Sequence, residues 1–325
     1  MSDNLLEIDS LNVEYVTDDA IVYALNDFSL KVKKGEKIGL VGETGAGKTT
    51  LALSILRLLP KKVGKITSGS IKYEDEELLD KPESFMLGLR GRKISMIFQD
   101  PMTSLNPVKT VGDQVLEVLD LHFPDFTKEG KNTKVDEIFK LVGIPPERKV
   151  EYPHQFSGGM KQRIVIAMAL IAEPELLLAD EPTTALDVTI QAQILELMKE
   201  LKVKYNSAVI LITHDLGVVA EFCDTVAVVY GGRVVEAGTV EEIFGMEKNH
   251  PYTQGLIHCI PNLSSTATRL SPIPGHMSDP RIKQKGCVFA DRCPKCMEKC
   301  KTEPPHMNYD GEHGILCHLF DKEEK

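Results

Sequence analysis

The stretch Gly42-Glu43-Thr44-Gly45-Ala46-Gly47-Lys48-Thr49 decides how this sequence folds. It lies between an apolar run at residues 37–41 and a helical pattern at residues 50–56. A glycine-rich loop between a strand and a helix lets backbone N–H groups converge on an anion, and the helix dipole adds positive charge. Lys48 is then placed for the β- and γ-phosphates of a nucleotide, and Thr49 for Mg²⁺. The stretch predicts a phosphate-binding loop, which alone does not distinguish a kinase, a GTPase or a transport ATPase.

Length and composition indicate a globular protein of two domains. The chain has 325 residues, a net charge of −10, 42% hydrophobic residues and 26% charged residues. Its longest uncharged apolar run, residues 164–172, is far shorter than the roughly 20 residues of a membrane-spanning helix. The polar start Met1-Ser2-Asp3-Asn4 lacks the basic residues of a secretory signal. We therefore expect a cytoplasmic protein, and the negative charge argues against general nucleic-acid binding.

Alternating apolar and polar residues predict strands in the first part of the chain, at residues 11–15, 21–24, 28–32 and 38–41. An antiparallel set before the phosphate loop would form a side wall for a nucleotide. Tyr15 ends the first of these strands and is a candidate for stacking on adenine. A half-buried strand tyrosine is an equally good interpretation.

Polar side chains follow buried strands later in the sequence. Gln99 comes directly after the apolar run at residues 94–98, and Asp180-Glu181 end the run that starts at residue 176. Doubly wound sheets hold ligands at such strand ends, and two buried carboxylates are costly unless a metal ion or a reaction uses them. His214 follows another such strand, at residues 208–213.

Three further segments complete the prediction. Residues 110–142 carry the periodicity of a small helical subdomain. Ser157-Gly158-Gly159 opens another helix, with Ser157 as the expected N-cap and two glycines that leave N–H groups accessible; a capped helix start alone would also explain it. Residues 226–236 predict a hairpin that closes the sheet.

Five of the seven cysteines gather near the end of the sequence, at Cys287, Cys293, Cys296, Cys300 and Cys317. In a reducing compartment this favours a metal site over disulfides. Spacing alone does not choose between zinc and an iron–sulfur cluster, and His306, His313 or His318 could replace a thiol. We interpret Cys223 and Cys259 as buried thiols.

Residues 281–301 carry seven basic and two acidic side chains, a net charge of +5. Such a stretch could balance a thiolate-bound cluster, or contact nucleic acid or lipid headgroups. A solvated charged surface remains the default interpretation.

Taken in order, these motifs resemble the ATP-binding subunit of an ABC transporter over about residues 5–245. The resemblance implies an α/β fold, a P-loop NTPase of the ABC type with a parallel core sheet, an antiparallel β subdomain and a helical subdomain, plus a small C-terminal cysteine-rich metal-binding domain. The implied nucleotide-binding domain covers residues 1–245, with the helical subdomain at about 100–172, and the C-terminal domain covers residues 246–325. The chain departs from the family at Phe156 and Met160, where leucine and glutamine are usual.

The resemblance also implies a role for each site residue. Glu181 would be the general base that activates the attacking water, His214 the sensor of the γ-phosphate, and Gln99 the link to the membrane subunits. Mg²⁺ would be held by Thr49, Gln99 and Asp180, the last through water. The implied ATP contacts are Tyr15, Gly42, Glu43, Thr44, Gly45, Ala46, Gly47, Lys48, Thr49, Thr50, Ser157, Gly158, Gly159, Asp180 and Asp187.

Within the family, residues 99–107, 249–253 and 286–294 resemble dipeptide and oligopeptide importers. This implies a protein on the inner face of the cell membrane that works with two integral membrane permease subunits and, indirectly, an extracytoplasmic peptide-binding protein. Because residues 157–159 serve the nucleotide of the opposite subunit in this family, a second ABC ATPase, a copy or a related chain, is also implied. The importer tail pattern matches Cys287, Cys293, Cys300 and Cys317 and implies a [4Fe-4S] cluster, with Zn²⁺ as the alternative; Cys296 lies outside the pattern.

A rival interpretation is a soluble ABC ATPase that acts on nucleic acid or ribosomes, to which the basic stretch would lend itself. Such proteins commonly join two ATPase units in one chain or add a long coiled coil, and neither pattern occurs here. A P-loop kinase or GTPase would leave Ser157-Gly158-Gly159 and His214 unexplained. The sequence therefore favours ATP-driven peptide import and argues against nucleic acid as a partner.

Overall fold

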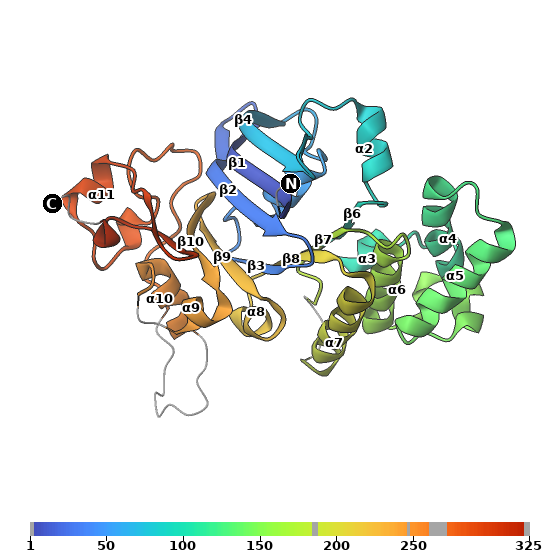
Figure 1. Cartoon of the computed structure of the whole chain (residues 1–325). Coiled ribbons are helices and arrows are strands. Elements are labelled where there is room, and N and C mark those ends of the chain that lie inside the picture. The colour runs from blue at the N-terminus through green and yellow to red at the C-terminus, as the bar shows by residue number, and fades with distance from the viewer. Residues whose placement is uncertain (1–2, 184–187, 246–247, 260–271, 322–325) are drawn as a thin grey trace. The chain divides into compact units, whose positions relative to one another are not determined.

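The computed structural model describes residues 3–183, 188–245, 248–259 and 272–321, which form two compact units (Figure 1). The first unit combines Met1–Val32, Lys37–Leu79 and Ile212–Lys325, and the second combines Lys33–Glu36 and Asp80–Leu211. Strand β8 (Ala208–Thr213) spans the change from the second unit to the first. The first unit is thus built from both halves of the sequence, whereas the second is almost continuous.

The first unit contains a sheet with the strand order β2, β1, β4, β5, formed by β2 (Ile21–Lys33), β1 (Asn4–Val16), β4 (Gly64–Tyr73) and β5 (Glu76–Glu77). Strands β1 and β4 pair antiparallel, from Leu6 opposite Tyr73 to Tyr15 opposite Gly64. The prediction of separate strands at residues 21–24 and 28–32 is wrong, because β2 is continuous. Asp27 adopts a left-handed φ of 52° between the two runs and donates its N–H to Asn12 Oδ1 at 3.0 Å, so the chain kinks without leaving the sheet.

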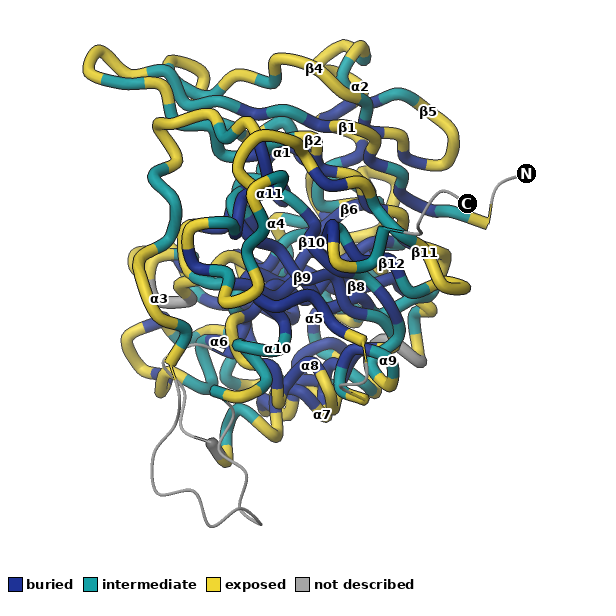
Figure 2. The backbone as a smooth tube through the Cα atoms, turned by 90° about the vertical axis from the view of Figure 1, so that its left-hand side faces the viewer, coloured by how far each residue is buried: buried dark blue, intermediate teal, exposed yellow. Residues whose placement is uncertain are grey.

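A second group of strands in the first unit carries the phosphate loop. Strand β3 (Lys37–Val41) pairs in parallel with β9 (Thr225–Tyr230), which forms the predicted hairpin with β10 (Arg233–Thr239). Figure 2 shows β9 almost entirely as buried tube, whereas half of β4 is exposed. Helices α8 (Leu216–Phe222), α9 (Val240–Phe244) and α10 (Pro251–His258) belong to the same unit.

The hairpin does not close the sheet, which corrects the prediction from sequence. Strand β10 pairs antiparallel with β12 (His313–Leu316), and β12 pairs with β11 (Met307–Asp310). Glu236 on β10 is fully buried, and its Oε1 lies 2.7 Å from His313 Nε2 on β12. A buried carboxylate needs such a partner, so β10 is suited to a central position in the sheet rather than an edge.

The second unit pairs β6 (Ile94–Ile97) in parallel with β7 (Leu176–Asp180), and every residue of β7 is buried, as expected of a parallel strand covered on both faces. Helices α4 (Val111–His122) and α5 (Lys128–Leu141) lie where the periodicity predicts helices. Thr110 and Thr127 cap them by accepting from Asp113 N and Gly130 N. The remaining helices of this unit are α2 (Glu83–Leu89), α3 (Pro101–Ser104), α6 (Gly158–Leu170), α7 (Val188–Tyr205) and two 3₁₀ turns (Pro146–Val150, Pro153–Gln155).

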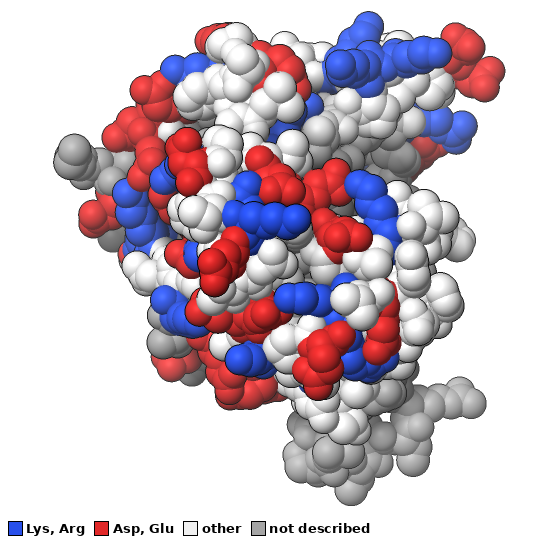
Figure 3. All heavy atoms as spheres, turned by 90° about the vertical axis from the view of Figure 1, so that its right-hand side faces the viewer, with Lys and Arg blue, Asp and Glu red and all other residues white. Residues whose placement is uncertain are grey.

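The surface is charged but mixed in sign. On the face drawn in Figure 3, basic and acidic side chains are interspersed, and no large area of one sign stands out. The second unit contains several of the ion pairs that give such a pattern, including Lys109 with Glu117 and Lys149 with Asp136. No helix in the described part of the chain combines the length and the apolar character needed to cross a bilayer.

Candidate functional site

The phosphate loop connects β3 to α1 (Lys48–Ile55), as the sequence predicts. Two of its glycines are required by close backbone packing. A Cβ at Gly42 would lie 2.1 Å from the carbonyl oxygen of Val229, and a Cβ at Gly47 would lie 2.5 Å from that of Ala24. Gly47 also has a left-handed φ of 101° at the N-cap of α1. Neighbouring strands therefore hold the loop in a shape that only glycine allows at these positions.

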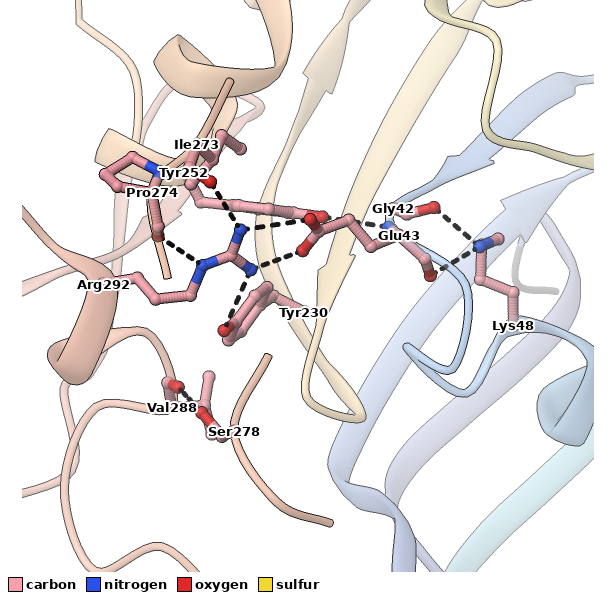
Figure 4. A network of polar contacts seen from close by, with 10 residues as sticks. All are labelled: Gly42, Glu43, Lys48, Tyr230, Tyr252, Ile273, Pro274, Ser278, Val288 and Arg292. Atoms are coloured by element: carbon pink, nitrogen blue, oxygen red, sulfur yellow. Dashed lines mark hydrogen bonds and ion pairs between the residues drawn. The ribbon is translucent and has the colours of Figure 1, made fainter. Parts of the chain in front are cut away.

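Lys48 is held inside the loop. Its side chain is buried, and Nζ donates hydrogen bonds to the carbonyl oxygens of Gly42 at 2.7 Å and Glu43 at 3.0 Å (Figure 4). These carbonyl groups fix the ammonium at the start of α1, where the helix dipole is positive. Thr44, Gly45 and Thr49 are exposed around it. The loop thus presents a fixed cation and accessible backbone to an incoming anion.

Tyr15 lies beside the helix that follows the loop. Its hydroxyl is 3.2 Å from Thr50 Oγ1, and the ring is only partly buried. The end of β1 and the first turn of α1 therefore meet, which places an aromatic ring next to the phosphate loop. This position suits the predicted adenine contact.

In the second unit, Gln99 and Glu181 lie in contact. Gln99 Nε2 donates to Glu181 Oε2 at 3.0 Å, because Gln99 follows β6 and Glu181 follows the paired strand β7. Asp180, the last residue of β7, is 2% exposed, whereas Glu181 is half-buried. Glu181 has a left-handed φ of 46°. Strained non-glycine residues cost about 1–3 kcal/mol each and cluster at functional sites, so this strand end is the strongest catalytic candidate of the unit.

The start of α6 is open to solvent. Ser157 occupies the predicted N-cap position, but its side chain makes no capping hydrogen bond. Ser157 and Gly158 are exposed, and a Cβ at Gly158 would meet no atom within 4 Å. Phe156 is buried beneath the guanidinium of Arg148, which lies 4.3 Å from the ring centroid. The helix start thus leaves its first N–H groups accessible, which is what the recognition of an anion from another molecule requires.

The remaining predicted site residues are distributed as follows. His214 is exposed directly after β8, in the first unit. The next residue, Asp215, caps α8 by accepting from Gly217 N at 2.8 Å. Asp187, with Ala185 and Leu186 of the same motif, lies outside the described residues.

Comparison with known proteins agrees with this geometry. The family described as "ABC transporter" matches residues 25–184, and the family "Oligopeptide/dipeptide transporter, C-terminal region" matches residues 235–300. The oligopeptide transport ATP-binding protein AppD of Bacillus subtilis is 46% identical over 98% of this chain and 98% of its own length. The dipeptide transport ATP-binding protein DppD of the same organism is 48% identical over 98% of this chain and 96% of its own length. The chain belongs to the ABC transporter ATP-binding family.

The chain is also similar in structure to solved ABC ATP-binding proteins. The structure of cbiO1 from Clostridium perfringens, part of the ABC transporter complex cbiONQ, is 30% identical, with a TM-score of 0.66 over 76% of this chain and 92% of that one. A dimeric ATP-binding cassette in a post-hydrolysis state, bound to ADP and Pi, is 28% identical, with a TM-score of 0.65 over 72% of this chain and 98% of that one. The predicted P-loop fold of the ABC type is therefore confirmed, and an ABC ATPase uses ATP and Mg²⁺.

The C-terminal segment of this ABC ATPase, residues 246–325, is called the tail below. Its predicted metal-binding character is not confirmed. Within residues 3–183, 188–245, 248–259 and 272–321, no group of three or more His, Cys, Asp or Glu side chains is arranged to hold a metal ion. All seven cysteines are free thiols, and Cys259 is only half-buried, contrary to prediction. The pKa of Cys287 is raised to about 12 and that of Cys317 to about 11, mainly by burial and in smaller part by neighbouring cysteines. The thiols of Cys287 and Cys317 are therefore protonated at neutral pH in this arrangement.

The basic stretch is less basic than its composition suggests. Four of its seven cations are paired with acidic side chains, three of which lie outside the stretch. The pairs are Arg281 with Asp279, Arg292 with Glu43, Lys299 with Asp321, and Lys301 with Glu298. A net charge counted along the sequence therefore overstates the local field.

Sequence reasoning missed two tail residues that contact the phosphate loop of this ABC ATPase. Tyr252 Oη accepts a hydrogen bond from Glu43 N at 3.0 Å, and Arg292 forms an ion pair with the Glu43 carboxylate. Both residues lie in segments that resemble peptide importers, and Arg292 also belongs to the basic stretch, but neither pattern predicts a contact with the loop. Their separation of more than 200 residues from the loop hides the contact from any local pattern.

Proposed function

We propose that this chain is the ATP-hydrolysing subunit of an ABC importer that takes up dipeptides or oligopeptides through separate permease subunits. The carrying observation is the full-length similarity to peptide-transport ATP-binding proteins, which includes the peptide-transporter C-terminal region. The alternative, an ABC ATPase that acts on nucleic acid, loses support because the basic stretch is largely neutralised within the chain.

In the proposed reaction, the loop from Gly42 to Thr49 holds the phosphates of ATP, and Tyr15 stacks on the adenine. Glu181 takes a proton from the attacking water, whose oxygen bonds to the γ-phosphorus while the bond to the β-phosphate oxygen breaks and ADP leaves. The hydrogen bond from Gln99 keeps the Glu181 carboxylate oriented at the strand end. Thr49, Gln99 and Asp180 would hold Mg²⁺, which would neutralise part of the phosphate charge.

The open start of α6 supports a role in trans. Ser157, Gly158 and Gly159 would contact the nucleotide of a second ABC ATPase subunit, and His214 would sense its own γ-phosphate. We propose a nucleotide-binding domain at residues 1–245 and a C-terminal domain at residues 246–325. The protein would lie in the cytoplasm on the inner face of the membrane, in contact with two permease subunits. An extracytoplasmic peptide-binding protein would deliver peptides to these permeases.

Peptide uptake in reconstituted vesicles tests this function. The chain, its two permeases and the partner ATPase should co-purify, and the vesicles should accumulate a labelled peptide only with ATP. The variant Lys48→Ala should assemble equally well but abolish uptake, because the phosphates lose their fixed cation. Recovery with ribosomes or RNA instead of membrane proteins would overturn the proposal.

We also propose that Cys287, Cys293, Cys300 and Cys317 bind a [4Fe-4S] cluster, with Zn²⁺ as the alternative. Two observations support it: Cys293, Cys300 and Cys317 all contribute to the raised pKa of Cys287 and so lie near it, and Cys287 N donates to Cys300 O at 2.7 Å. Binding would require the thiols to deprotonate and move together. Anaerobically purified protein should contain iron and sulfide and absorb visible light, Cys300→Ser should lose both, and Cys296→Ser should keep both. A colourless protein with stoichiometric zinc would contradict the cluster.

A further inference from the structure

A residue of the tail reaches the phosphate loop across 249 positions of sequence (Figure 4). Arg292 donates from Nη1 to Glu43 Oε2 at 2.6 Å and from Nη2 to Glu43 Oε1 at 3.1 Å. Two parallel bonds between a guanidinium and a carboxylate fix orientation as well as charge. Glu43 is the second residue of the loop, so the tail forms an ion pair with the loop itself.

The Arg292 side chain is held in a fixed position by burial and by several hydrogen bonds. Its side chain is only 5% exposed, and it also donates from Nε to the carbonyl oxygen of Pro274 at 3.1 Å and from Nη1 to Tyr230 Oη at 3.4 Å. The guanidinium lies 6.0 Å from the ring centroid of Phe289. The hydrogen bond to Glu43 is the main cause of the raised pKa of Arg292. The cation is therefore permanent and rigidly aimed at the loop.

Glu43 is held at three points. Its carboxylate binds Arg292, its N–H donates to the buried Tyr252 Oη at 3.0 Å, and its carbonyl oxygen accepts from Lys48 Nζ at 3.0 Å. Tyr252 in turn packs edge-on against Tyr230 with 4.7 Å between ring centroids. The residue that positions the loop lysine is thus itself positioned by the tail.

The charge of Glu43 gives this contact a consequence for nucleotide binding. A free carboxylate in a loop that receives a triphosphate would repel it, and the repulsion is strong where water is partly excluded. We infer that Arg292 is a positioning residue for ATP binding, an inference that rests on the nucleotide site proposed above. Arg292 neutralises the charge of Glu43 and, through Glu43, fixes the loop that holds Lys48. The C-terminal domain therefore contributes directly to ATP affinity.

A suppression experiment on the full chain tests this inference. The Kd of a fluorescent ATP analogue with Mg²⁺ is measured by titration for the unmodified chain, Arg292→Gln, Glu43→Gln and the double variant. R292Q should raise the Kd by about tenfold, because it leaves the loop carboxylate unpaired (about 1.4 kcal/mol). The double variant should return to within about twofold of the unmodified chain, since the repelling charge is gone. A merely structural role of Arg292 would not be rescued by a change in the loop.

Arg281→Gln is the matched control, because Arg281 also donates to both carboxylate oxygens of an acidic residue, Asp279, in the same tail but at an exposed position. It should leave the Kd unchanged. An R292Q chain that binds as tightly as the unmodified one, or a double variant as weak as R292Q, would overturn the inference.

Two further variants remove ambiguity. If R292Q cannot be purified folded, Arg292→Lys replaces it: a lysine keeps the charge but not the two-pronged pair, so the Kd should rise about threefold and fall again with Glu43→Gln. No rise, or a rise that Glu43→Gln does not suppress, contradicts the inference. Lys48→Ala should abolish binding; retained binding there would contradict the proposed nucleotide site rather than the role of Arg292.

Discussion

Glu181 adopts a backbone conformation that few residues other than glycine accept, directly after a strand of five buried residues. The left-handed turn sends the chain away from the sheet, so that Asp180 stays buried while Glu181 is half-exposed and in contact with Gln99. No other element of the second unit combines a carboxylate, backbone strain and a polar partner at a strand end among the described residues. These features make Glu181 the residue on which hydrolysis should depend.

We expect Glu181→Gln to lower ATP turnover by about 100-fold or more while the Kd for ATP stays unchanged, because an amide keeps the size of the side chain but cannot accept the proton. Phosphate release in the assembled transporter measures this. Glu173→Gln is the control, since Glu173 is also a left-handed glutamate, with φ 55°, but is exposed and paired with Lys134. Normal turnover in E181Q would exclude Glu181 as the base.

His250 gives the fold a dependence on pH. It is fully buried at the start of α10, where Nδ1 accepts from Tyr252 N at 3.1 Å, and burial lowers its pKa to about 3. The unfolded chain binds a proton at His250 below a pH of about 6.5, whereas the folded chain does not. The folded state should therefore lose stability as the pH falls from about 6.5 toward 3, by up to about 1.4 kcal/mol per pH unit.

The variant His250→Asn checks this dependence, because asparagine keeps a capping acceptor without a titratable ring. Urea unfolding between pH 7 and pH 5 should show a smaller loss of stability in the variant than in the unmodified chain. Equal slopes of stability against pH in the two proteins would show that His250 does not contribute.

At the scale of elements, the sequence predicts local structure well where one segment carries all the information. The strand, glycine loop and helix around Lys48, the two helices between residues 110 and 142, and the buried strand that ends at Asp180 all follow from apolar spacing and glycine. The close contact of Gln99 with Glu181 follows from the rule that parallel strands end at the same edge.

The sequence predicts less where distant segments meet. Nothing in residues 226–236 indicates that β12 will pair with β10, because strand pairing over some 80 residues leaves no periodic signal. The predicted break within β2 is wrong because Asp27 adopts a left-handed conformation while the strand continues on both sides of it. The link between Arg292 and the loop is missed for the same reason of distance.

The start of α6 gives a prediction at this scale. Gly158→Ala should fold normally, because an added Cβ meets no atom within 4 Å, but it should lower ATP turnover of the assembled transporter about tenfold or more by crowding the nucleotide of the partner subunit. Gly88→Ala in α2 is the control, since it has equally open surroundings at a helix without a proposed role. Full turnover in G158A would show that Gly158 does not approach a nucleotide.

For the whole molecule, the tail acts as a structural part of the first unit. A chain that stops after residue 305 lacks β11 and β12 and leaves Glu236 without His313. Hydrogen exchange should then accelerate at the amides of β10 and β9 by about tenfold or more, whereas β6 and β7 of the second unit should keep their protection. A chain that stops after residue 321 is the control. Unchanged protection of β10 in the shorter chain would contradict this role of the tail.

The division of the sequence between the two units bears on how the protein is made. The ribosome completes the nearly continuous Asp80–Leu211 before it synthesises β9, the strand that pairs with β3, and β12, the strand that pairs with β10. At about 5–20 residues per second, β3 would remain without its β9 neighbour for roughly 10–40 seconds. During that time the strand that carries the phosphate loop is an apolar segment without its β9 partner, so newly made chains should depend on chaperones until β9 emerges.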